Sequence, residues 1–167
     1  FLYDTPRNNL GSRTIILTSE MTSTKQYEQG IEEALTRNDK AQLESHLTRQ
    51  HSLSSDILLW AFENNIQLDT EIVQLLIENG ANINACDQYG WTVLMGAASM
   101  NQSAMCLTLI ELGADVNARV SYGQTALVIA AQRNHLDCCC VLIEHGADVN
   151  ATDQSGKSAL MFAVEKG

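Results

Sequence analysis

The feature that most constrains the fold of this chain is an internal repeat with a period of 33 residues. Three Gly-Ala pairs keep this spacing, at 80–81, 113–114 and 146–147, and three Asn-Ala pairs keep it at 84–85, 117–118 and 150–151. Units of this length are too small to bury an apolar face alone, so they stack on their neighbours. The repeat therefore predicts an elongated array of similar units.

Each unit carries the signals of two helices. A hydroxyl residue that can cap the first helix by accepting a backbone N–H recurs at Thr92, Thr125 and Ser158. An apolar, alanine-rich face follows, and asparagines at 101 and 134 mark the break before a second helix with a wider apolar stripe. The glycines at 80, 113 and 146 fit the position after that helix, where φ is positive. We expect an extended arm with a tight turn after each glycine.

This pattern resembles the ankyrin repeat, which has the same period and a T-P-L-H-x-A signature. The resemblance is strongest over residues 86–167 and implies an all-α fold, an ankyrin-repeat α-solenoid with short β-turn arms. Two departures predict a somewhat less rigid array, because a preset φ and a hydrogen bond between repeats are lost. The proline of the signature is replaced by Val93, Ala126 and Ala159, and its histidine by Met95, Val128 and Met161.

The repeats suggest a division of the chain into six segments. Residues 1–23 form an N-terminal extension without repeat signal, and 24–52 resemble a polar, two-helix capping repeat. Residues 53–85 form a divergent repeat with about three extra residues between its helices, the second of which Asp69 is expected to cap. Good repeats follow at 86–118 and 119–151, and 152–167 form a truncated one.

Composition limits the classes of partner and compartment. Twenty acidic residues against ten basic ones give a net charge of −10, which argues against nucleic acid as a partner. No apolar run is long enough for membrane insertion. Five cysteines without a CxxC motif, and no signal peptide, indicate an intracellular protein of a reducing compartment, cytoplasmic or nuclear.

The residues that could carry chemistry are better explained as structure. Cys138, Cys139 and Cys140 are neighbours on one helix, so they cannot converge on one metal ion. The repeat places Cys138 and Cys139 in the core and Cys140 nearer the surface, while a reactive thiol remains the alternative. We expect solvated structural roles for the histidines, which are at 46, 51, 135 and 145. No phosphate loop, catalytic triad or dinucleotide motif occurs, so we expect no cofactor, no metal and no enzyme activity.

The family resemblance instead directs attention to the surface. In ankyrin-like proteins the turn tips and the exposed side of the first helix form a concave binding surface, which implies a non-catalytic protein–protein interaction module. An alternative is a regulatory or targeting domain of a larger enzyme, channel or secreted effector. Local packing of the aromatic residues is the competing explanation for part of this surface. The implied partner-binding residues are Gln88, Tyr89, Trp91, Ser99, Met100, Arg119, Tyr122, Gln124, Gln132, Arg133 and Lys157.

Two further expectations concern single features. The resemblance implies that Asn117 and Asn150, in their "DVNA" context, are candidates for asparaginyl hydroxylation, whereas the simpler alternative is that they bond only their own turn. At the C-terminal end, Leu160, Ala163 and Val164 lack the cover of a second helix, although Leu160 is expected to pack against the preceding repeat. Self-association through this truncated face is therefore a further expectation.

Overall fold

The computed structural model describes residues 26–47, 53–64, 66 and 68–166. The chain divides into two compact units, Phe1–His51 and Ser52–Gly167. Within the described ranges the regular elements are α-helices, and β-type pairing is confined to two isolated bridges. The prediction of an all-α fold with short turn arms is confirmed. The extension predicted at 1–23 lies outside the described residues.

The first unit contains a helical hairpin. Residues 26–36 are helical, and α2 (Lys40–Leu47) follows a break at Asn38, where φ is +53°. The Asp39 carboxylate starts α2 by accepting the Gln42 N–H at 3.0 Å. The two helices approach closely at Gly30, where a Cβ would lie 2.7 Å from His46 Cε1. His46 is therefore half-buried against Gly30 rather than solvated as predicted, and His51 lies outside the described residues.

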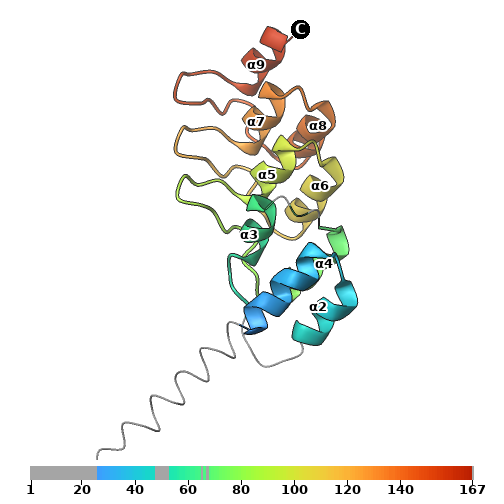
Figure 1. The fold of residues 1–167 in the computed structure, drawn as a ribbon. Helices are drawn as coiled ribbons and strands as arrows, with labels where there is room; N and C mark the ends of the chain where they lie inside the picture. Colours follow the sequence, from blue (N-terminus) through green and yellow to red (C-terminus); the bar gives the residue numbers. More distant parts are fainter. Residues whose placement is uncertain (1–25, 48–52, 65, 67, 167) are drawn as a thin grey trace, which may run out of the picture. The chain divides into compact units, whose positions relative to one another are not determined.

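The second unit repeats a pair of helices along its length. Its helices alternate between a first and a second position in each repeat, and α3, α5, α7 and α9 stack as one column beside the projecting arms, with α6 and α8 on the other side (Figure 1). Alanines at the contacts between first helices allow this close stacking, and the helices α5 and α7 are almost wholly buried. The bounds are α3 (Ile57–Glu63), α4 (Thr70–Glu78), α5 (Val93–Ser99), α6 (Ser103–Glu111), α7 (Ala126–Gln132), α8 (Leu136–Glu144) and α9 (Ala159–Lys166).

The predicted helix starts are confirmed for the first helices. The Thr92 and Thr125 hydroxyls accept the N–H groups of Met95 and Val128, both at 3.4 Å. Asp69 is the residue before α4 as predicted, but its side chain makes no capping bond, which corrects that expectation. Its backbone carbonyl instead accepts the N–H of Ile72 at 3.1 Å.

The predicted helix ends are confirmed as well. Gly80, Gly113 and Gly146 follow the second helices with φ of +98°, +98° and +90°, in the left-handed region that favours glycine. Asn101 and Asn134 separate the paired helices with φ of +57° and +61°. These positions fix where each helix stops and where its arm begins.

The arms are narrow hairpins that follow each second helix. In the arm before α5, Asp87 N–H bonds the Trp91 carbonyl at 3.1 Å, and an isolated bridge joins Cys86 to Thr92. Gly90 turns the tip with φ of +83°, and a Cβ there would lie 2.9 Å from the Arg119 carbonyl oxygen of the next arm. Glycine is thus required at this tip both for its conformation and for the closeness of the neighbouring arm.

Candidate functional site

The structure places the predicted binding residues on the side of the second unit that carries the arms. We call these eleven residues the turn-tip surface. The tips carry Gln88, Tyr89 and Tyr122, the arm bases carry Trp91, Gln124 and Lys157, and Arg119 begins the second arm. The C-terminal ends of α5 and α7 carry Ser99, Met100, Gln132 and Arg133. Side-chain bonds connect two of the arm bases to first helices, because Gln124 donates to Gln132 of α7 at 3.5 Å and Lys157 pairs with Glu165 of α9 at 2.6 Å.

Backbone bonds between arms hold the tips in place. The Tyr89 carbonyl accepts both the N–H of Ser121, at 2.7 Å, and its hydroxyl, at 2.9 Å. One arm further, the Tyr122 carbonyl accepts the N–H of Gln154 at 2.8 Å, and the Gln154 amide donates to the Ser121 carbonyl at 2.7 Å. The bonds of Ser121 and Gln154 therefore link consecutive arms, which the repeat pattern of the sequence did not predict.

The exposed aromatic residues of this surface are the tip tyrosines. Tyr89 and Tyr122 are 50% and 57% exposed. Trp91, by contrast, is half-buried, and a Cβ placed on Gly96 of α5 would lie 3.8 Å from its indole Nε1. The same Cβ would lie 3.1 Å from Phe62 of α3. Local packing near α5 therefore explains why the Trp91 side chain is half-buried. For this residue, local packing was the explanation that competed with partner binding.

The positive charges of the turn-tip surface are largely engaged with the protein itself. The Arg119 guanidinium donates to the carbonyls of Gly123, at 3.4 Å, and Thr152, at 3.3 Å. Lys157 pairs with Glu165 and lies 5.3 Å from the centre of the Phe162 ring. Arg133, at the end of α7, is exposed and forms no ion pair within the described residues. The Arg119 guanidinium thus links two neighbouring arms, rather than being left free to contact a partner.

A second set of bonds, on the asparagines that end each repeat, was missed by sequence reasoning. The Asn117 amide donates to the Gly146 carbonyl at 3.1 Å and accepts the Asp148 N–H at 2.8 Å, and Asn84 bonds Gly113 and Asp115 in the same way. The expectation that Asn117 bonds only its own turn is wrong, because its side-chain amide bonds the following repeat, while its N–H donates to Asp115 within the turn. The sequence did contain a signal for these bonds. Each turn has two polar residues, such as Asp115 and Asn117, and only one of them is needed to bond the turn itself.

Asn150 stands at the same position of the following repeat and forms neither bond within the described residues. Its own N–H is satisfied by Asp148 at 2.9 Å. Hydroxylation of Asn117 and Asn150 stays a prediction, and both residues are exposed.

The cysteines follow the predicted pattern with one exception. All five are free thiols. Cys138 is fully buried and donates to the Asn101 amide oxygen at 3.6 Å, and Cys106 is fully buried as well. Burial raises the pKa of both thiols, which suppresses their thiolate forms. Cys139 was predicted to be core but is only half-buried, because the described chain places no second helix over it.

The remaining histidines take part in helix-end bonds. His135 precedes α8, and its Nδ1 lies 2.9 Å from the Ala98 carbonyl oxygen of the preceding repeat. His145 follows α8, with its Nδ1 2.7 Å from the Val141 carbonyl oxygen. His135 is half-buried and links two repeats, which corrects its prediction as a solvated residue, whereas His145 is exposed.

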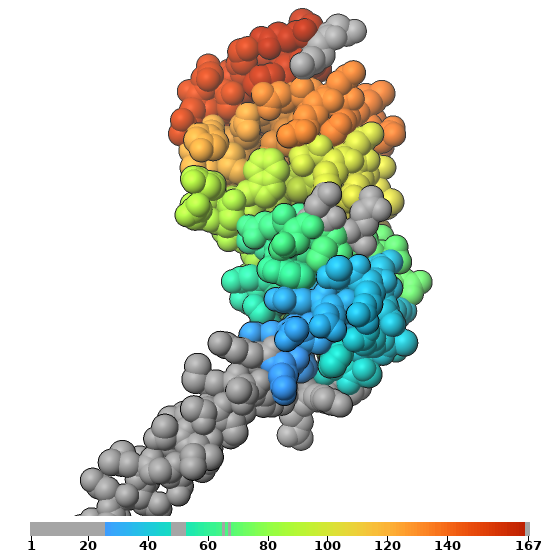
Figure 2. Space-filling view, in the orientation of Figure 1, coloured from blue at the N-terminus to red at the C-terminus, as the bar shows by residue number. Residues whose placement is uncertain are grey.

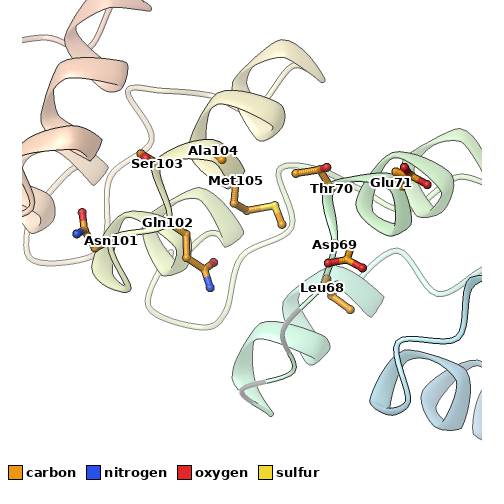
Figure 3. Close-up of a pocket in the computed structure, with 9 residues that line it drawn as sticks. All are labelled: Leu68, Asp69, Thr70, Glu71, Asn101, Gln102, Ser103, Ala104 and Met105. Carbon is orange, nitrogen blue, oxygen red and sulfur yellow. The ribbon is translucent and has the colours of Figure 1, made fainter.

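A polar notch of about 660 Å³ lies between the starts of α4 and α6, whose side chains face each other across it (Figure 3). It follows from the divergent repeat, where residues 64–69 connect α3 to α4 and only 100–102 connect α5 to α6. This difference confirms the three extra residues that the sequence predicted. The notch contains the carboxylates of Asp69 and Glu71 but no Cys or His, so its lining resembles neither a nucleophile–base pair nor a metal site.

The described residues contain no group of His, Cys, Asp and Glu side chains that could hold a metal ion. None of the helices in the described part of the chain has the length and apolar character needed to cross a membrane. A family model described as ankyrin repeats, in three copies, matches residues 31–120 and 118–167. No curated protein matches the chain in the comparison made.

Proposed function

We propose that this chain, which belongs to the ankyrin repeat family, binds a partner protein through its turn-tip surface. Ankyrin repeats are generally protein–protein interaction modules, and members of the family are typically non-catalytic. The surface itself supports the choice of binding face, because its polar and aromatic groups project from elements that hydrogen bonds already fix.

The observation that carries the proposal is the pair of exposed tyrosines on rigid tips. The Asp87 carboxylate accepts the N–H groups of Tyr89 and Trp91, both at 2.8 Å. These bonds lie within the arm and hold the backbone of its tip in place. The Tyr89 carbonyl is in turn bound by Ser121 of the next arm. Exposed tyrosines on a preordered backbone lose little conformational entropy on binding, and tyrosine is enriched among the residues that dominate protein interfaces.

The charges of the protein indicate which chemical group of a partner the turn-tip surface contacts. The protein carries a net charge of −10, and Arg133 lies at the end of α7 beside Gln132, in an exposed position. We expect Arg133 to contact a carboxylate of the partner, because arginine forms directional pairs with carboxylates. Arg133→Glu should therefore slow association more than it speeds dissociation, as is usual for charges at the rim of an interface.

The proposal is tested with a partner captured on the immobilised chain and then purified. Tyr89→Ala combined with Tyr122→Ala should weaken its binding about 1,000-fold, since aromatic anchors contribute about 2 kcal/mol each. The dissociation constant is measured by surface plasmon resonance or calorimetry. Trp91 is left intact, because its half-buried indole packs near α5 and its removal would disturb the fold.

The matched control is Glu78→Ala combined with Glu111→Ala, two exposed residues at the ends of α4 and α6. This variant should bind as the wild type does, and both double variants should keep the wild-type circular dichroism spectrum and melting temperature. If the glutamate variant loses binding while the tyrosine variant keeps it, the partner binds the side of the second helices and the proposal is wrong.

A further inference from the structure

Two features of the second unit are not explained by the turn-tip surface. The first is at α9, the outermost helix of this unit, which is red in Figure 2. Leu160 is 70% exposed there, so it does not pack against the preceding repeat as the sequence suggested, and self-association through this face stays a prediction. The second feature is the end of α4, where Asn79 is the only asparagine of the sequence that a glycine follows.

The step from Asn79 to Gly80 combines the two groups of a spontaneous reaction. Asparagine is a chemically labile residue, and its amide is lost most readily before glycine, because no side chain there hinders attack by the backbone nitrogen of the glycine. Asn79 is exposed, so water has access to it. Leu112 and His145 precede the equivalent glycines of the next two repeats, so those helix ends cannot react in this way.

The last turn of α4 holds both reacting groups in hydrogen bonds. The Asn79 side-chain amide donates to the Leu75 carbonyl at 2.8 Å, and the Gly80 N–H donates to the Ile77 carbonyl at 3.0 Å. For the Gly80 nitrogen to attack the Asn79 side chain, its N–H must leave Ile77 and the amide must turn away from Leu75. The reaction therefore requires this turn to open.

The backbone directly after α4 positions the contact between two repeats. The Asn82 N–H donates to the Ser55 carbonyl at 3.0 Å, which fixes the arm to the start of the divergent repeat. Two residues later, the Asn84 amide donates to the Gly113 carbonyl at 3.3 Å and accepts the Asp115 N–H at 2.8 Å. A change of backbone length at the end of α4 therefore shifts both sets of bonds.

We propose that Asn79 deamidates spontaneously when the last turn of α4 opens, and that the product weakens the junction between the divergent repeat and the next one. The Gly80 nitrogen forms a bond with Asn79 Cγ while the Cγ–Nδ2 bond breaks, and ammonia leaves with the proton of the Gly80 N–H. Water then opens the cyclic imide at one of its two carbonyls. The product at position 79 is an aspartate or an isoaspartate, in which the backbone runs through the side chain and is longer by one carbon atom.

The two products differ in their effect on the junction. Both place a negative charge beside Glu78 at the C-terminal end of α4, where the helix dipole disfavours anions. Only the isoaspartate also lengthens the chain, which displaces Gly80 and the arm that follows. That displacement misaligns the Asn82 N–H with Ser55 and the Asn84 amide with the next repeat. The isoaspartate, which is the commoner product of imide hydrolysis, therefore weakens the contact between the repeats.

The reaction is tested by ageing the 167-residue chain at mildly alkaline pH, both folded and unfolded in guanidinium chloride, beside a peptide of residues 68–84 with blocked ends. Peptide mapping by mass spectrometry follows deamidation at each asparagine. Asn79 should be the first asparagine modified in the peptide and in the unfolded chain. In the folded chain it should react at least about tenfold more slowly, in proportion to the open fraction of the last turn. Equal rates in the folded and unfolded chain would overturn the gating, and earlier modification of another asparagine would overturn the choice of site.

The effect on the junction is measured by hydrogen exchange on the isoaspartate form, isolated from the aged chain by anion exchange. The Asp115 amide, which donates to Asn84, should exchange at least about tenfold faster than before ageing. The Asp148 amide, which Asn117 holds in the same way, is the matched control and should not change. Asn79→Gln should age without this change, and Asn79→Asp, which adds the charge without the longer backbone, should keep the protection of Asp115. Unchanged exchange of Asp115 in the isoaspartate form, or an equal loss of protection in Asn79→Asp, would refute the proposed weakening.

Discussion

At the scale of single residues, the asparagines at the repeat ends show that the same type of side chain contributes differently to the free energy of unfolding at equivalent positions of two repeats. Asn117 joins two repeats through a donated and an accepted bond, whereas Asn150 makes neither within the described residues. Asn117→Ala should lower the free energy of unfolding by about 1–2 kcal/mol, since each exposed bond contributes about 0.5–1.5 kcal/mol net. Asn150→Ala should change it by under about 0.5 kcal/mol. Urea unfolding followed by circular dichroism measures both, and equal losses would contradict the assigned bonds.

At the scale of helices, the stripe of the second helix supplies the apolar contacts between repeats. Leu109 of α6 and Leu142 of α8 are completely buried, and α6 packs on α8. Leu109→Ala or Leu142→Ala should therefore cost about 2–5 kcal/mol, as for other buried leucines. Leu160→Ala on α9 is the matched control and should cost under about 0.5 kcal/mol, because that side chain is already exposed. Chemical unfolding checks all three, and a loss under about 1 kcal/mol at both buried sites would refute the helical register.

At the scale of the second unit, stability should decrease toward α9. Repeat arrays are stabilised by interfaces between neighbours, and α7 contacts α5, α8 and α9, whereas α9 is covered mainly by α7. In native-state hydrogen exchange, the amides of α9 should open with the lowest free energy of the first helices, and those of α7 with the highest. An added polar capping repeat should raise protection in α9 and the melting temperature together. Uniform protection across α5, α7 and α9 would instead indicate a single cooperative unit.

What the sequence by itself determined about this protein is local and periodic. The 33-residue spacing, the hydroxyl caps at Thr92 and Thr125 and the glycines after the second helices set the helix boundaries and the family. These features act through hydrogen bonds between residues that are close in the sequence, so the order of the residues alone is enough to identify them. The set of residues on the turn-tip surface could be listed for the same reason, because repeat register places equivalent residues on one side.

Only the tertiary structure decided which of these residues are engaged. Arg119 and Asn117 bond backbone groups about one repeat away, and Cys139 is left half-buried by the absence of a covering helix in the described chain. Asp69 precedes α4 without a capping side-chain bond, although the sequence predicted one. Repeat register assigns the same environment to every equivalent position. Burial and hydrogen bonding depend instead on the neighbour in space, and that neighbour differs at each step along the stack.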